Sequence, residues 1–163
     1  MVSDIACRLS PTNAGTVPNA AVLACLGSAE GRARVLQALT DGDDGEVQIA
    51  EVYLGHRPIT DVGELRVVAS GITRMPGSAA QVRALETLAR HRLSDRQSLD
   101  ELTRLFPVSR SVDVQRAIAA VFIRSDLQQL RKPEMVRVLS ENRLKSPTGG
   151  DIIDILIRRL QTP

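Results

Sequence analysis

The chain has 163 residues, of which 43% are hydrophobic and 25% are charged, so it holds enough apolar material for one globular domain with a continuous core. It has no run of about 18 apolar residues, and its start lacks a basic segment followed by an apolar one, so the sequence predicts neither a membrane span nor a signal peptide. We therefore expect a cytoplasmic protein. The same features fit the C-terminal module of a larger protein.

The net charge of +2 is unevenly distributed along the chain. Residues 1–57 carry 4 basic and 7 acidic side chains, and the remainder carries 17 and 12. All but two of the 21 basic residues are arginine, which favours forked hydrogen bonds to carboxylates or phosphates. This positive surplus is nevertheless mild for a dedicated nucleic-acid-binding protein, and only one Tyr and two Phe are present to stack on bases.

Residues 1–18 contain several helix breakers and are predicted to form a linker or a loosely ordered segment before a helical domain at residues 19–163. The two cysteines, Cys7 and Cys25, match no metal-binding or redox motif. Two ordinary thiols are the favoured interpretation, and a disulfide between them is the alternative for an exported protein.

Apolar residues recur at helical spacing along the domain, beginning with residues 20–26 and 32–39. Four later helices start with capping-box patterns, in which Asp or Ser is followed three residues later by Glu or Gln. These pairs are Asp43 with Glu46, Asp61 with Glu64, Ser78 with Gln81, and Ser94 with Gln97. Because no alternating strand pattern of useful length is present, the predicted fold class is all-α.

Later helix boundaries are predicted mainly from prolines. Pro107 is expected to stop the helix that starts near Ser94, because its ring cannot continue the helical hydrogen bonds. The next helix should fade near Ser125, and Pro133 suits the first turn of the helix after it.

A short theme recurs at the start of three of these helices. It reads Glu46-Val-Gln-Ile-Ala50, Gln81-Val-Arg-Ala-Leu85 and Asp113-Val-Gln-Arg-Ala117, so its valines are Val47, Val82 and Val114. Their spacing is nearly constant and falls in the range of helical-pair repeats. Such a period, with one helical pair in each repeat, is typical of an α-solenoid of stacked antiparallel helix pairs, since no pair can bury its apolar face alone.

This arrangement resembles the HEAT-repeat family over residues 32–124. Leu99-x-x-Leu102-x-x-Leu105 followed by Val114-Gln-Arg-Ala117 looks like the outer and inner helices of one repeat, and two earlier pairs are similar. HEAT repeats often place an Arg directly after the inner-helix valine, where it forms a polar ladder with an Asp in the turn. Here that position holds Gln48, Arg83 and Gln115, so we expect an incomplete ladder and repeats held mainly by aliphatic packing.

No motif supports catalysis, a metal site or a cofactor. The aspartates at residues 41–44 stand beside glycines at a helix start, where they are better explained as caps than as a catalytic pair or a calcium loop. His56 and His91 fall at predicted helix ends, and no nucleophile motif or phosphate-binding glycine loop is present. We therefore expect a protein that is not an enzyme. A similarity to the HEAT-like lyases that attach pigments would require a deep pocket with convergent polar groups.

The predicted function is that of a non-catalytic scaffold for protein–protein interaction. Stacked helical repeats present an extended concave surface, and mixed charges on it favour a protein partner. The alternative is nucleic-acid binding through the Arg-rich later part of the chain, which would weaken steeply as salt rises. The residues predicted to line the surface stand one, four or eight positions after the leading valines: Gln48, Glu51, Arg83, Glu86, Arg90 and Gln115.

The last predicted helix adds one candidate for a partner contact. Its residues Ile152, Ile153, Leu156, Ile157 and Leu160 already supply a core face, and Ile155 adds apolar surface on another side. A terminal solenoid helix normally turns a polar face to water. We expect Ile155 to pack on a missing domain, a second copy or a partner. The alternative is that the preceding helix at residues 135–144 covers it.

Overall fold

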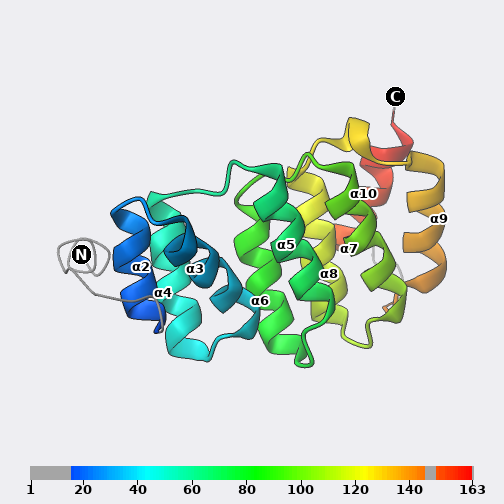
Figure 1. The fold of residues 1–163 in the computed structure, drawn as a ribbon. Coiled ribbons are helices and arrows are strands. Elements are labelled where there is room, and N and C mark those ends of the chain that lie inside the picture. The colour runs from blue at the N-terminus through cyan, green and yellow to red at the C-terminus, as the bar shows by residue number, and fades with distance from the viewer. Residues whose placement is uncertain (1–15, 146–149, 163) are drawn as a thin grey trace. The chain divides into compact units, whose positions relative to one another are not determined.

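The computed structural model describes residues 16–145 and 150–162, and its regular structure within these ranges is helical throughout (Figure 1). The all-α class predicted from the sequence is therefore confirmed for the described part of the chain. None of these helices is long and apolar enough to cross a membrane. They are α2 (Val17–Cys25), α3 (Ala29–Asp41), α4 (Asp44–His56), α5 (Val62–Thr73), α6 (Ser78–Ala89), α7 (Arg96–Val108), α8 (Val112–Arg124), the short 3-10 helix η1 (Leu127–Gln129), α9 (Lys132–Asn142) and α10 (Ile152–Gln161).

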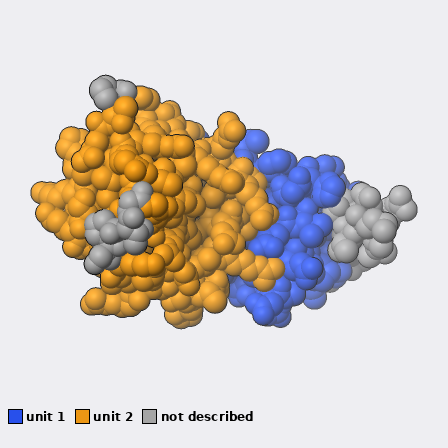
Figure 2. Space-filling view, turned by 180° about the vertical axis from the view of Figure 1, so that it is seen from behind, with its two compact units in different colours: residues 1–64 blue, residues 65–163 orange. Residues whose placement is uncertain are grey.

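The chain divides into two compact units, unit 1 at residues 1–64 and unit 2 at residues 65–163 (Figure 2). The boundary falls within α5, whose first turn belongs to unit 1 and whose remainder belongs to unit 2. Buried apolar side chains are present in both units, so each has a core of its own.

In unit 1, α2, α3 and α4 pack against one another. Helices α2 and α3 approach closely because Gly31 has no side chain. A Cβ atom there would lie 2.6 Å from the carbonyl oxygen of Ala20 and 2.8 Å from the amide nitrogen of Ala24. The turn before α3 uses Gly27, whose φ of +94° is strained for residues with a side chain. Glycine at these two positions therefore allows α3 to turn back and lie against α2.

Arg32 on α3 joins three segments of unit 1. Its Nε and Nη2 atoms donate to the two carboxylate oxygens of Glu64 at 2.6 and 2.9 Å. Nη1 donates to the hydroxyl of Tyr53 at 3.2 Å and to the carbonyl of Arg57 at 3.1 Å, and Nη2 also donates to the carbonyl of Pro58 at 3.1 Å. All five N–H groups of the guanidinium are thereby used. The bonds to Glu64 are the main cause of a raised pKa at Arg32, and the whole set ties the α4–α5 connection to α3.

In unit 2, α8 contacts α6, α7 and α10, and α9 contacts both α7 and α10. Aliphatic side chains fill the core together with Phe106 and Phe122, which are fully buried. Because α7 and α8 carry their apolar residues at helical spacing, each buries one face and leaves charged residues on the other.

Two of the predicted helix starts are confirmed. In the capping box before α4, the amide of Glu46 donates to the Asp43 carboxylate at 2.9 Å, and the amide of Asp43 donates to the Glu46 carboxylate at 3.0 Å. Before α5, Asp61 accepts a hydrogen bond from the amide of Glu64 at 3.0 Å. The Glu64 carboxylate binds Arg32 on α3.

The other two predicted capping boxes are wrong. Helix α6 begins at Ser78 and is preceded by Gly77, which provides no side-chain cap. Helix α7 is capped by Asp95, one residue later than the predicted cap at Ser94, and Asp95 accepts hydrogen bonds from the amide and the hydroxyl of Ser98 at 3.0 and 2.8 Å. In both cases a neighbouring residue takes the N-cap position that the local pattern assigned to serine.

The proline-based boundaries agree with the structure to within one residue. Helix α7 continues one residue past Pro107, which lies in its last turn. Helix α8 ends before Ser125, and Pro133 lies in the first turn of α9, as predicted. Pro107 has no N–H to donate to the carbonyl of Thr103, and the helix ends one residue later.

Cys25, the last residue of α2, is disulfide-bonded, so the favoured interpretation of an ordinary thiol is wrong at this position. Cys7 and the rest of residues 1–15 lie outside the described residues, so most of the predicted linker does too. Helix α2 begins at Val17, close to the predicted domain start at residue 19, and Thr16 caps it by accepting a hydrogen bond from the amide of Asn19 at 3.3 Å.

Candidate functional site

A shallow groove crosses α6, α8 and the start of α10 in unit 2. Two adjoining hollows of about 530 and 320 Å³ share Glu86, Ala120 and Ile152, and together they form one open depression. We call it the α6–α8–α10 groove. Its other lining residues are Ala79, Val82, Ala89, Arg90, Asp113, Arg116, Ala117, Ile123 and Arg124.

The groove forms because small side chains line it. Four alanines from α6 and α8 face it, whereas the large side chains of the same helices, such as Leu85 and Phe122, are fully buried in the core. Val82, Ile123 and Ile152 are half-buried, so part of their apolar surface stays accessible. An open, apolar floor of this kind suits the face of a peptide or helix better than a small molecule, which needs a more enclosed cavity.

Arg116 positions α10 at the groove. Its Nε donates to Oδ2 of Asp151 at 3.0 Å, and its Nη1 lies 3.9 Å from Oδ1 of Asp113 on the same helix. The side chain of Asp151 is 5% exposed and caps α10 by accepting a hydrogen bond from the amide of Ile153 at 2.8 Å. This ion pair therefore joins the start of α10, which supplies Ile152, to α8.

Three further charged side chains at the groove take no part in ion pairs of the described residues. Glu86, Arg90 and Arg124 are exposed, and none of them forms an ion pair with another described residue. Because both signs occur on one surface, the groove is complementary to a partner that also carries both signs.

The structure brings two of the predicted site residues into this groove, Glu86 and Arg90. Arg83 lies on the same helix but is half-buried and lines neither hollow. Gln48 and Glu51 lie on α4 in unit 1, where Gln48 is exposed and Glu51 is half-buried. The groove is therefore built from residues of unit 2 alone.

The prediction of Gln115 as a partner-binding residue is wrong, because this residue is 0% exposed. Its Nε2 donates to the carbonyl oxygens of Phe106 at 3.2 Å and Asn142 at 2.9 Å, and its Oε1 accepts a hydrogen bond from the amide of Leu144 at 2.9 Å. Phe106 lies in the last turn of α7 and Asn142 ends α9, where carbonyl groups lack helical partners. Gln115 therefore holds the ends of two helices.

Gln81 has the equivalent role on α6. Its Nε2 donates to the carbonyl of Ile72, nine residues earlier and near the end of α5, at 3.0 Å, and Gln115 binds Phe106 at the same separation. The interval from Gln81 to Gln115 also separates the successive N-cap residues of α4, α6 and α8, which are Asp43, Gly77 and Ser111. We call this interval the structural period. The site positions were counted from Val47, Val82 and Val114, which are not separated by the structural period. These valines therefore occupy different positions in their helices, and this explains the wrong prediction for Gln115.

Ion pairs between helices two apart in the chain form a second feature that the sequence analysis missed. Arg32 on α3 binds Glu64 on α5, Arg66 on α5 binds Asp95 at the start of α7 at 2.9 Å, and Arg116 on α8 binds Asp151 at the start of α10. In each case an Arg is followed 29 to 35 residues later by an acid at a helix start, and this spacing could have revealed them. Arg66 is the main cause of the lowered pKa of Asp95, about 2.

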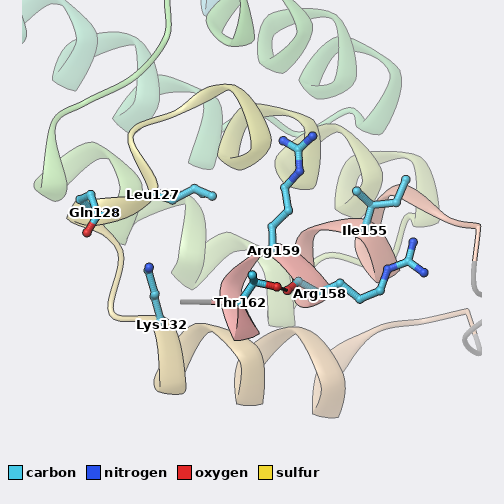
Figure 3. Close-up of a pocket in the computed structure, with 7 residues that line it drawn as sticks. All are labelled: Leu127, Gln128, Lys132, Ile155, Arg158, Arg159 and Thr162. Carbon is cyan, nitrogen blue, oxygen red and sulfur yellow. Dashed lines mark hydrogen bonds between the residues drawn. The ribbon is translucent and has the colours of Figure 1, made fainter.

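A separate pocket of about 420 Å³ lies among η1, the start of α9 and the second half of α10 (Figure 3). Ile155, the residue predicted to contact a partner, is half-buried and lines it, so α9 does not cover this side chain fully. Three lining residues are cationic and none is acidic, so we call it the basic pocket. It is lined by Leu127, Gln128, Lys132, Ile155, Arg158, Arg159 and Thr162.

Metal-binding residue types form no cluster in the part of the chain that the structure describes. Within residues 16–145 and 150–162, no group of three or more His, Cys, Asp or Glu side chains could hold a metal ion. His56 is exposed and His91 is half-buried, and neither lines the α6–α8–α10 groove or the basic pocket. What these surfaces offer chemically is apolar contact and charge pairing.

No protein-family model, curated protein or solved structure matches the chain. The resemblance to HEAT repeats thus rests on the sequence motifs alone. Function is inferred from the geometry and charge of the surfaces themselves.

Proposed function

We propose that this protein is a non-catalytic, HEAT-like scaffold that binds another protein in the α6–α8–α10 groove. The observation that carries the proposal is the alanine-lined, apolar floor of this groove with unpaired charges of both signs beside it. A segment of the partner would pack apolar side chains against Ala120 and Ile152 and place charged groups opposite Glu86 and Arg90.

The helix arrangement supports the solenoid part of this proposal. The N-caps of α4, α6 and α8 are equally spaced, and their constant interval lies in the range of helical-pair repeats. Helix α8 contacts α6 and α10, and α7 contacts α9, so helices two apart in the chain are neighbours in space. Stacked pairs produce such contacts, and they expose the surface of one helix layer as an extended groove.

Nucleic acid fits this groove less well than a protein segment does. Glu86 and Asp113 line it and would repel phosphates, and no aromatic side chain lines it to stack on a base. Arg116, one of the three arginines that line the groove, is already paired with Asp151. Nucleic-acid binding through an Arg-rich face therefore remains the alternative outcome of the experiment.

The test is capture of partners from the native host's lysate by the tagged full chain, with and without nuclease, followed by mass spectrometry. Ala120→Arg places a long cation on the floor that both hollows share, and Ala80→Arg adds the same charge at an exposed position of α6 outside the groove. We expect the wild type and Ala80→Arg to retain the same few proteins after nuclease treatment, and Ala120→Arg to lose them.

A captured protein is then purified and titrated against the three chains by calorimetry, after urea unfolding has shown that the two variants are equally stable. A dissociation constant for Ala120→Arg at least about tenfold above that of Ala80→Arg, equivalent to about 1.4 kcal/mol, supports the groove. Equal affinities refute the groove as the binding site. Complete loss of captured proteins with nuclease refutes the protein-scaffold function and favours nucleic acid.

A further inference from the structure

The basic pocket is separate from the α6–α8–α10 groove, since the two share no lining residue. Figure 3 shows Leu127, Gln128 and Lys132 on one side of the pocket and Ile155 and Arg158 on the other, with Arg159 extending from α10 between them. Arg158 and Arg159 stand three and four residues after Ile155, so both flank this side chain on the next helical turn.

The three cations of the pocket have no charge partner within the described part of the chain. Lys132, Arg158 and Arg159 form no ion pair there and donate no side-chain hydrogen bond, and no Asp or Glu lines the pocket. Elsewhere in unit 2, Arg66 and Arg116 are each bound to an aspartate. Three uncompensated positive charges around one hollow create a potential that attracts an anionic group.

The helix dipole explains only part of this charge. Arg158 and Arg159 lie in the last turn of α10, where a positive charge is favourable. Lys132 lies in the first turn of α9, where the dipole disfavours it. A cation held at an unfavourable helix end beside two others points to a ligand for the pocket.

Apolar surface in the same pocket indicates that the ligand also carries an apolar group. Leu127 and Ile155 are half-buried there, and no aromatic side chain lines the pocket. A free phosphate or a nucleic-acid backbone would leave this apolar surface without contact, and a base would find no ring to stack on. A peptide with one aliphatic residue among acidic ones would use both the charge and the apolar surface. The volume of about 420 Å³ lies within the usual range of binding pockets.

We propose that the basic pocket binds an acidic segment of a partner protein. An aliphatic side chain of that segment packs between Leu127 and Ile155, and neighbouring carboxylates pair with Lys132, Arg158 and Arg159. The planar guanidinium groups match carboxylates with two parallel hydrogen bonds each. This contact is independent of the α6–α8–α10 groove.

The experiment selects a random phage-displayed peptide library on the full chain and then measures the selected peptides, in synthetic form, by fluorescence anisotropy. We expect recovered peptides to combine Asp or Glu with Leu, Ile or Val. The double variant R158A/R159A should raise their dissociation constant at least about tenfold. The matched control R110A/R137A removes the same charge from two exposed arginines outside the pocket and should leave it unchanged. Ile155→Ser, which removes the apolar contact, should also weaken binding.

Several outcomes would overturn the proposal. Recovery of no peptide, of peptides without acidic residues, or equal affinity for the two double variants would each do so. Binding of single-stranded oligonucleotides or of phosphatidylserine vesicles that R158A/R159A alone abolishes, without peptide binding, would assign the pocket to a polyanion. Self-association that R158A/R159A alone abolishes, measured by sedimentation, would assign it to a second copy. Ala120→Arg should leave peptide binding intact, so failure of the groove and failure of the pocket are distinguishable.

Discussion

Buried glutamines hold the ends of helices in unit 2. The last carbonyl groups of an α-helix lack helical partners. The carbonyls of Ile72 and Phe106, near the ends of α5 and α7, are bound by the buried side chains of Gln81 and Gln115. A glutamine amide offers both donors and an acceptor, so Gln115 satisfies two carbonyls and one amide at once. Gln81 does the same for one carbonyl of α5. At the residue scale, a polar side chain in the core therefore stabilises the fold through the backbone.

Replacing Gln115 by leucine should strongly destabilise the protein. The change leaves the carbonyls of Phe106 and Asn142 and the amide of Leu144 without partners, and we expect the free energy of unfolding to fall by about 2–4 kcal/mol. Urea unfolding measures it. Gln97→Leu, at an exposed position of α7, is the matched control and should change the free energy by less than about 0.5 kcal/mol. Equal stability of the two variants would contradict the role assigned to Gln115.

Asp95 should make stability depend on pH in the acid range. Its hydrogen bonds with Arg66 and Ser98 hold its pKa at about 2 in the folded state, below the ordinary value of 3.8. A lowered folded-state pKa contributes stability that is fully present above about pH 4 and is lost as the pH falls towards 2. Asp95→Asn keeps a side chain able to cap α7 but removes the charge.

The urea midpoints of the wild type and Asp95→Asn should therefore differ at pH 5 and converge near pH 2. Because the pair is partly solvated, the difference at pH 5 should correspond to about 1 kcal/mol or less. A difference between wild type and Asp95→Asn that stays constant with pH would rule out this titration.

At the scale of single elements, local chemistry decides how much the sequence can predict. The Asp43–Glu46 box is visible in the sequence because both partners lie within one helical turn. Ser78 and Gln81 have the same spacing and also fit the capping-box pattern, but the Gln81 side chain donates instead to a carbonyl of the preceding helix. No local pattern contains that carbonyl, so the predicted cap is wrong although the helix itself is placed correctly.

The candidate site, like the helix starts, could be predicted from the sequence only in part. Glu86 and Arg90 are charged, so their position on an amphipathic helix already implies an accessible face, and the structure places both at the groove. Gln115 has a residue type that is mostly exposed, and only three tertiary partners make its burial favourable. The groove itself depends on alanines of α6 and α8 lying side by side, which requires the packing of the two helices to be known.

Two glycines on helices of unit 1 should respond differently to replacement by alanine. At Gly31 the new Cβ would meet backbone atoms of α2 at 2.6 and 2.8 Å, so α2 and α3 must separate, which we expect to cost about 1–3 kcal/mol. At Gly55 on α4 nothing lies within 4 Å, so alanine should leave stability unchanged or raise it by up to about 1 kcal/mol. Thermal unfolding of the wild type and both variants measures these changes in stability. Similar midpoints would show that α2 and α3 do not need this close contact.

At the scale of the whole molecule, the two units differ in charge and in the sites that they carry. Residues 1–64 hold 9 acidic and 4 basic side chains, whereas residues 65–163 hold 10 and 17. The α6–α8–α10 groove and the basic pocket both belong to unit 2. An acidic partner is therefore attracted to the unit that carries the proposed sites and repelled by the other, which favours correct orientation during encounter at low salt.

Because each unit has its own core, a destabilising substitution in one unit is expected to increase local unfolding in that unit only. Arg32→Ala removes the five hydrogen bonds through which Arg32 ties the α4–α5 connection to α3, so hydrogen exchange should accelerate across the described part of unit 1 and stay slow in unit 2. Gln115→Leu should give the reverse pattern. Arg34→Ala, on the same helix as Arg32 and with a single 3.6 Å ion pair to Glu46, is the control and should change little. Acceleration throughout the chain in either variant would show that the two units open together.

The shared role of Gln81 and Gln115 limits how the chain could grow. Each binds a carbonyl nine residues earlier, and the two lie one structural period apart. If residues 77–110, which span one such period, were duplicated in tandem, the copied Gln81 would stand nine residues after Phe106 and inherit the carbonyl that Gln115 now binds. Gln115 would in turn meet the copied Phe106. An insertion of another length would bring a different side chain to that carbonyl. The buried glutamine amide thus restricts insertions that preserve this contact to whole structural periods, so a gene duplication could lengthen the protein only in steps of that size.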